Sequence, residues 1–241
     1  MQTASSDVVC PSVKLPQIAE KQKGINMNKH SEIIIRQETS ADYFAVENLT
    51  REAFWNVYRP GCEEHYVLHC FRDRPDFIPE LSLVMERVCD DGSRELIAHV
   101  MFAWSEIMVD GEPPHALRMM TFGPISVRPD LQRMGYGKRL LDYAMEIARK
   151  MNGGCIAMCG NIQFYGKCGF VVATTKGIRY ADDPDGDAPY FLIKELTPGF
   201  LDGITGSYRD PSGYFIDKDE CEEFDKQFPP KQKLKLPGQL V

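Results

Sequence analysis

The sequence predicts an α/β domain built on a mixed, mostly antiparallel sheet with helices on both faces. Two observations carry this prediction. Strand-like segments at 81–88, 95–108 and 116–127 follow one another through short turns rich in Asp and Gly, which indicates consecutive hairpins. An amphipathic stretch at 137–153 instead joins 116–127 to an apolar strand at 155–159. A strand–helix–strand unit of this length implies parallel pairing across the helix.

The segments before the hairpins predict an arm, a strand and two helices. Residues 1–30 are polar with little periodicity, so we expect a flexible arm, and Met27 is an alternative start because folded sequence begins just after it. A short strand is expected at 33–36. Helices are expected from Thr39 onward and over 63–72.

The segments after the central helix complete the predicted sheet. Strands are expected at 155–159, 170–174 and 190–196, and 206–208 extends the last of them. We expect the folded domain to span residues 31–208. Residues 209–241 are then an extension packed on the domain or trailing it, with one amphipathic helix at 221–228 that ends before two prolines.

Composition narrows the class of protein. The 241 residues are 43% hydrophobic and 26% charged, as in a soluble globular protein, and the net charge of −7 argues against a general nucleic-acid or membrane-surface binder. No apolar run approaches the roughly 20 residues that span a bilayer. The eight cysteines form neither C-x-x-C pairs nor a His/Cys zinc pattern. We therefore expect reduced thiols, a cytoplasmic location and no metal site.

A glycine-rich turn at the start of the central helix is the strongest chemical signal. Gln132, Gly135 and Gly137 form the pattern Q-x-x-G-x-G between the strand and the helix, with Arg133 and Lys138 beside it. The first N–H groups of a helix have no partner within it and carry partial positive charge. Glycine leaves no Cβ in the way of an approaching anion. The turn is therefore suited to bind a phosphate or diphosphate.

Two motifs together resemble the Gcn5-related N-acetyltransferase (GNAT) superfamily. The pattern V-x-P-x-x-Q-x-x-G-x-G from Val127 is similar to motif A, and Y-x-x-x-G-F from Tyr165 is similar to motif B at the expected distance downstream. Within the superfamily, GPISVRPDLQRMGYG and FYGKCGF look most like the YhbS-like branch. The resemblance covers roughly residues 33–196, on to 208. It implies the GNAT fold, a twisted sheet whose central strands splay apart.

The resemblance also implies a binding site for acetyl-CoA. Backbone groups of the strand end would bind the pantetheine arm, and the amides of the glycine turn would bind the diphosphate. Asn161 stands where family members contact CoA, although its spacing to the next tyrosine is shorter than the family's usual one. The implied contacts are Ile125, Ser126, Val127, Gln132, Arg133, Met134, Gly135, Tyr136, Gly137, Lys138 and Asn161.

Tyr165 matches the tyrosine that many GNAT enzymes use as a general acid. Its phenol would protonate the departing CoA thiolate, which leaves better when it receives a proton. An aromatic residue between Phe164 and Phe170 also fits simple packing.

The acceptor side is less defined by sequence. In GNAT folds the helices after the first strand help to form the acceptor cleft, so Glu64 and His65 are candidate substrate contacts, with a solvated helix face as the alternative. Some family members carry a glutamate base six residues before Val127, where this chain has Thr121. Glu106, His115, Glu64 and His65 remain candidates for the base.

The sequence thus leads to two hypotheses. The first is an acetyl-CoA-dependent N-acetyltransferase that acts on a primary amine of a small molecule or peptide by direct attack. The second is a non-catalytic acyl-CoA-binding or protein-interaction module on the same fold. Under both hypotheses we expect no nucleic-acid partner, no membrane partner and no metal. The protein could form a homodimer under either.

Overall fold

The computed structural model describes residues 32–240, so the arm predicted for residues 1–30 and the alternative start at Met27 lie outside the described residues. Within them, nine strands form one sheet in the order β1-β2-β3-β4-β5-β8-β6, and β9 pairs with both β3 and β7. The strands are β1 (Ile33–Gln37), β2 (Leu83–Val88), β3 (Arg94–Val109), β4 (His115–Val127), β5 (Cys155–Cys159), β6 (Val171–Val172), β7 (Ile178–Tyr180), β8 (Phe191–Glu195) and β9 (Gly206–Tyr208). Pairings are antiparallel except β4 with β5 and β7 with β9.

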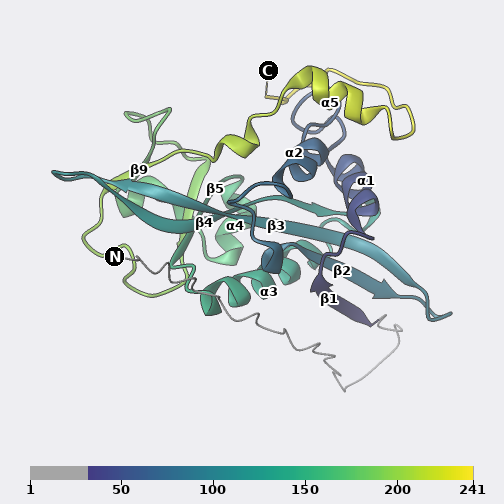
Figure 1. Cartoon of the computed structure of the whole chain (residues 1–241), viewed down its shortest axis with the longest axis horizontal. Helices are drawn as coiled ribbons and strands as arrows, with labels where there is room; N and C mark the ends of the chain where they lie inside the picture. The colour runs from purple at the N-terminus through teal and green to yellow at the C-terminus, as the bar shows by residue number, and fades with distance from the viewer. Residues whose placement is uncertain (1–31, 241) are drawn as a thin grey trace, which may run out of the picture.

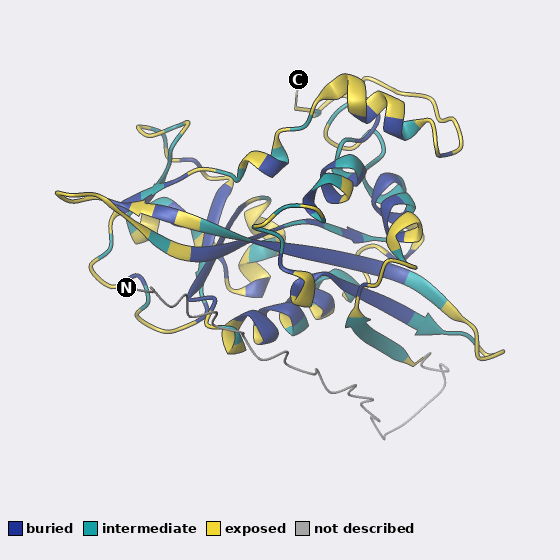
Figure 2. Cartoon of the chain, in the orientation of Figure 1, coloured by how far each residue is buried: buried dark blue, intermediate teal, exposed yellow. Residues whose placement is uncertain are grey.

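Helices cover both faces of the sheet, which confirms the predicted α/β class (Figure 1). Helix α3 (Tyr136–Lys150) lies against one face, and α1 (Tyr43–Phe54) and α2 (Glu64–Phe71) lie against the other. The apolar stripe of α3 explains its position, since Leu140, Leu141 and Ala144 are buried against the sheet while its charged side faces solvent (Figure 2). The main hydrophobic core therefore fills the space between α3 and the sheet.

Some predicted boundaries are wrong near the end of the domain. The strand expected at 170–174 ends after β6, because the chain turns into a 3₁₀ helix at Ala173–Lys176. That helix stops at Gly177, whose φ of +75° few other residues adopt. Strand β7 follows and was not predicted. Helix α5 (Lys218–Asp225) begins earlier than expected because the Asp217 side chain accepts hydrogen bonds from its first amides.

The centre of the sheet splays open where β4 leaves β5. The two strands pair only at Met120 and Ile156, close to the middle of the sheet. Beyond that point β4 carries a bulge, because Gly123 and Pro124 together face a single residue of β3. The bulge turns the end of β4 away from β5 and leaves its backbone edge beside a gap.

The C-terminal extension packs back over α1 and α2 (Figure 1). Arg51 of α1 is fully buried and binds Asp225 of α5 through two hydrogen bonds of 2.6 and 3.0 Å. Nearer the sheet, the Tyr214 hydroxyl donates to the carbonyl oxygen of Gly123 in the bulge (3.0 Å). Residues 209–240 thus contribute side chains next to the splayed strands. None of the helices within residues 32–240 is both long and apolar enough to cross a bilayer.

Candidate active site

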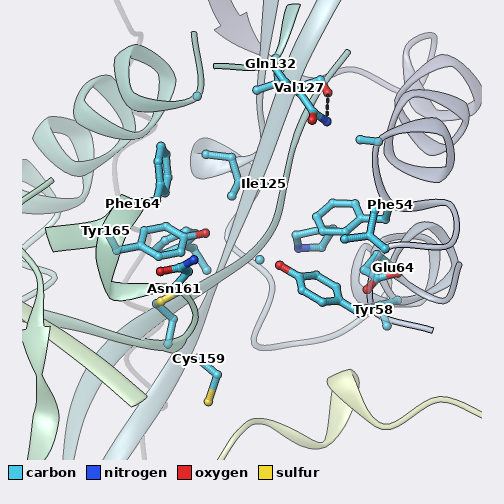
Figure 3. A pocket seen from close by; sticks show the side chains of 18 of the residues that line it. Phe54, Tyr58, Glu64, Ile125, Val127, Gln132, Cys159, Asn161, Phe164 and Tyr165 are labelled. Atoms are coloured by element: carbon cyan, nitrogen blue, oxygen red, sulfur yellow. Dashed lines mark hydrogen bonds between the residues drawn. The ribbon is translucent and has the colours of Figure 1, made fainter. Parts of the chain in front are cut away.

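A cleft of about 930 Å³ occupies the gap between the diverging strands β4 and β5. One wall comes from α1 and the loop that leads to α2. The other comes from the N-terminus of α3 and the short helix α4 (Ile162–Tyr165). In Figure 3 Tyr165 and Phe164 face Tyr58 and Phe54 across the open space. The site is therefore a passage with a backbone edge at its floor and aromatic side chains on both sides.

The edge of β4 presents backbone groups to the cleft. The amide of Arg128 donates to Ile97 on β3 (2.9 Å), and the register pairs Val127 with Ala98. Because antiparallel residues alternate in their hydrogen bonding, the N–H and C=O groups of Ile125 and Val127 point away from β3. The Gln132 side-chain amide donates to the Val127 carbonyl oxygen (3.2 Å, Figure 3). An extended ligand can thus pair with this edge as a further strand would.

The turn that enters α3 has the geometry of an anion site. Arg133 and Gly135 both have positive φ, +63° and +91°, which curls the chain before the helix. The first backbone bond of α3 runs from Arg139 N to Gly135 O (3.0 Å), so the amides of Tyr136, Gly137 and Lys138 precede it. A Cβ at Gly137 would lie 3.4 Å from Val127, on the cleft side. These amides and the helix dipole favour negative charge here.

Tyr165 is held by its neighbours with its hydroxyl directed into the cleft (Figure 3). Asn161 caps α4 by accepting a hydrogen bond from Gln163 N (2.8 Å), and its carbonyl oxygen accepts from Tyr165 N (3.0 Å). The Tyr165 ring packs edge-on against Phe122, with centroids 5.7 Å apart. Burial raises the pKa of Tyr165 above its ordinary value, and Tyr58 adds to the effect. The phenol is therefore a proton donor in this environment, not a phenolate.

The facing wall contains residues that the sequence motifs did not indicate. Phe54, Val57 and Tyr58 line it, with the Glu64 carboxylate nearby. Burial raises the pKa of Tyr58, and Glu64 raises it further. Lys167, Asp210 and Tyr214 also line the cleft. Apart from Lys167, which belongs to the Y-x-x-x-G-F motif, these positions lie outside both motifs and come together only through tertiary packing.

Most of the predicted site residues line this one cleft. They are Ile125, Val127, Gln132, Arg133, Gly135, Gly137, Lys138, Asn161, Tyr165 and Glu64. Three predicted cofactor contacts have side chains elsewhere. Ser126 is buried against Thr50, with hydroxyl oxygens 3.0 Å apart. Met134 is 63% exposed, and Tyr136 packs on the main core. The structure thus does not bring the side chains of these three into the cleft with the others.

The predicted acceptor contact at His65 is wrong. His65 is completely buried between α2 and α5, where Nε2 lies 3.0 Å from Asp225 Oδ1. Burial lowers the pKa of His65 to about 4, which Asp225 partly opposes. His65 therefore supports the C-terminal helix and does not reach the cleft. Two other candidate bases, Glu106 and His115, lie on the distal β3–β4 hairpin, outside the cleft-lining residues.

Comparison with known proteins decides the family. The model of the acetyltransferase (GNAT) family matches residues 46–170. The chain belongs to this family. No curated protein matches the chain.

Solved structures of GNAT proteins share the fold. GNAT family N-acetyltransferase YhbS from Escherichia coli, solved in complex with CoA, is 19% identical with a TM-score of 0.62, over 80% of this chain and 97% of that one. A GNAT family acetyltransferase from Brucella melitensis, solved in complex with acetyl-CoA, is 20% identical with a TM-score of 0.56, and the match covers 77% of this chain and 99% of that one. At these identities the similarity extends to the fold alone.

The described cleft offers no donor set for a metal. Nowhere within residues 32–240 do three or more His, Cys, Asp or Glu side chains gather in a way that could hold a metal ion. The seven cysteines in that range are free thiols.

Proposed function

We propose that this protein transfers the acetyl group of acetyl-CoA to a primary amine. The observation that carries the proposal is the convergence of three features on one cleft: the N-terminus of α3, the free edge of β4 at Ile125 and Val127, and the Tyr165 hydroxyl. CoA has a diphosphate, an extended amide-containing arm and a thiol in that order. We assign the three features to these three parts of CoA respectively. Membership of the GNAT family and the CoA and acetyl-CoA complexes of two structural relatives support the same ligand.

On the cofactor side, the amides from Arg133 to Lys138 would hold the diphosphate. Arg133 and Lys138 lie beside these amides and add positive charge, and Lys138 is paired with Asp142 (2.5 Å) on the exposed surface of the helix. The amide groups of the pantetheine arm would pair with Ile125 and Val127 along the β4 edge. This arrangement leads the thioester toward Tyr165 at the far side of the gap.

In the reaction, the lone pair of the neutral amine attacks the thioester carbonyl carbon and forms the new C–N bond. The C–S bond then breaks and the electron pair leaves with sulfur. Tyr165 donates its proton to that sulfur. The nitrogen of the new amide gives up one proton, which returns to the Tyr165 oxygen through solvent, so charge and protons balance and the phenol is restored. Backbone N–H groups of the β4 edge would polarise the carbonyl oxygen. Because only the neutral amine attacks, the rate is expected to rise with pH.

The proposal is tested by following free thiol from acetyl-CoA in the presence of primary amines. We expect thiol release that requires an amine, together with an acetylated product detected by mass spectrometry. Acetyl-CoA binding without thiol release for any amine would instead support the rival hypothesis, a non-catalytic acyl-CoA-binding module. The Thr121 hydroxyl at the position of a family glutamate base is the observation that favours that rival.

A further inference from the structure

The last residues of the chain hold the loop that forms the cleft wall opposite Tyr165. We call residues 229–240 the C-terminal segment and residues 55–61 the wall loop. The indole nitrogen of Trp55 donates to Gln232 O (3.0 Å), the Gln239 side-chain amide donates to Asn56 O (2.9 Å), and Leu240 N donates to Tyr58 O (2.7 Å). Contacts thus reach the wall loop from several points along the segment.

Asn56 is the centre of this contact. Its φ is +60°, a conformation that asparagine tolerates better than most residues. Its side-chain oxygen accepts from Gly61 N (2.9 Å) and Leu234 N (3.0 Å), and its side-chain nitrogen donates to Gln232 O (3.1 Å). One side chain therefore closes the wall loop on itself and ties it to the C-terminal segment.

The wall that is held in this way is apolar where it faces the cleft. Val57 and Tyr58 are 48% and 44% exposed, although side chains of this kind are usually buried. Arg59, in the same loop, forms an ion pair with Glu63. Glu64, beside Tyr58, leaves a carboxylate at this wall. The surface suits a ligand with a large apolar body and a positive charge.

We propose that the acetyl acceptor is a primary amine with an aromatic or bulky aliphatic body, and that the C-terminal segment positions the wall loop that selects it. The inference rests on the proposed acetyl transfer. The apolar body would pack against Phe54, Val57 and Tyr58, and its amine would face the thioester near Tyr165. The Glu64 carboxylate lines this wall, so it attracts the ammonium form of the acceptor before that form loses its proton, and the same charge repels a carboxylate next to the amine.

The acceptor class is tested with 2-phenylethylamine, ethylamine, cadaverine and phenylalanine at equal concentration. We expect kcat/KM for 2-phenylethylamine to exceed that of each of the others at least tenfold. Preference for ethylamine, cadaverine or phenylalanine would overturn the assignment. If no amine releases thiol, calorimetry of 2-phenylethylamine on CoA-saturated protein decides instead. If 2-phenylethylamine does not bind, the proposal that the wall loop binds the acceptor is refuted. Titration of acetyl-CoA alone tests the cofactor site separately.

The positioning role is tested with two point variants of the full chain. Asn56→Gly keeps the backbone conformation and removes the side-chain bonds. Gln239→Ala removes one further bond to the wall loop, at Asn56 O, and two bonds within the C-terminal segment, at Leu234 O and Leu236 N. Lys235→Ala, exposed on the same segment, is the matched control. We expect faster amide exchange in residues 55–61 and a roughly tenfold higher KM, or a weaker calorimetric Kd, for 2-phenylethylamine in the first two variants. The Kd for acetyl-CoA should not change. Faster exchange with an unchanged amine KM and Kd would show that the segment serves only stability.

Discussion

Replacing Gly137 with glutamate is expected to stabilise helix α3 while it weakens acetyl-CoA binding. Gly137 is the second residue of α3, where an acidic side chain complements the helix dipole by about 0.3–1 kcal/mol. A Cβ there meets Val127 at 3.4 Å and Phe164 at 3.7 Å, which are ordinary contacts, so the fold accommodates the substitution. The two measured quantities should therefore move in opposite directions.

The magnitude follows from the charge placed at the proposed diphosphate site. Two like charges about 5 Å apart repel by about 3 kcal/mol at an effective dielectric constant of about 20. That corresponds to a Kd about a hundredfold weaker than for Gly137→Gln, which fills the same space without charge. Gly137→Ala is the size control and should bind acetyl-CoA nearly as the wild type does.

Calorimetric titration with acetyl-CoA and thermal unfolding of the same samples provide the assay. The gap in affinity between the glutamine and glutamate variants should narrow in about 1 M salt, where charges are screened over about 3 Å. Equal acetyl-CoA affinity in these two folded variants, independent of salt, would refute a diphosphate site at the start of α3.

Two further predictions concern Tyr165 and His65. Tyr165→Phe keeps the packing of the ring against Phe122 and removes only the hydroxyl, so turnover should fall by about 10²–10⁴ with acetyl-CoA affinity unchanged; wild-type turnover would exclude it as the general acid. Burial lowers the pKa of His65 to about 4 in the folded protein, whereas the ordinary histidine pKa of about 6.5 applies in the unfolded chain. Between these two pH values the unfolded chain binds a proton at His65 and the folded protein does not, so protonation favours unfolding. Stability should fall as pH drops from 6.5 toward 4, by at most about 3 kcal/mol from this group, and His65→Gln should flatten urea-unfolding free energies over that window. An unchanged pH slope in His65→Gln would contradict the assignment.

The parts of the site that sequence predicted are those set by local pattern. The glycines at Gly135 and Gly137 together with the periodic apolar residues after them predicted the start of α3, and the same apolar residues predicted its buried face. The strand before the turn follows from its apolar pattern, whereas the roles of the β4 edge and of Tyr165 are what the resemblance of the two motifs to the GNAT superfamily implies. Local pattern therefore predicted the elements, and the resemblance predicted which of their residues bind acetyl-CoA.

The opposite wall could not be predicted because it depends on contacts between distant segments. Tyr58 lies in a loop whose position is set by Gln239 and Leu240, more than 170 residues later. Asp210 and Tyr214 also reach the cleft from the C-terminal extension, which carries no motif. The burial of His65 could have been predicted from the sequence. His65, Leu68 and Phe71 are spaced three residues apart, so they lie on the same buried face of α2.

A crystal structure of the protein with acetyl-CoA tests the central claim most directly. The account predicts the diphosphate on the amides from Arg133 to Lys138, the pantetheine arm paired with the edge of β4 at Ile125 and Val127, and the thioester sulfur within hydrogen-bonding distance of the Tyr165 hydroxyl. A diphosphate bound away from the N-terminus of α3, or a thioester remote from Tyr165, would contradict it.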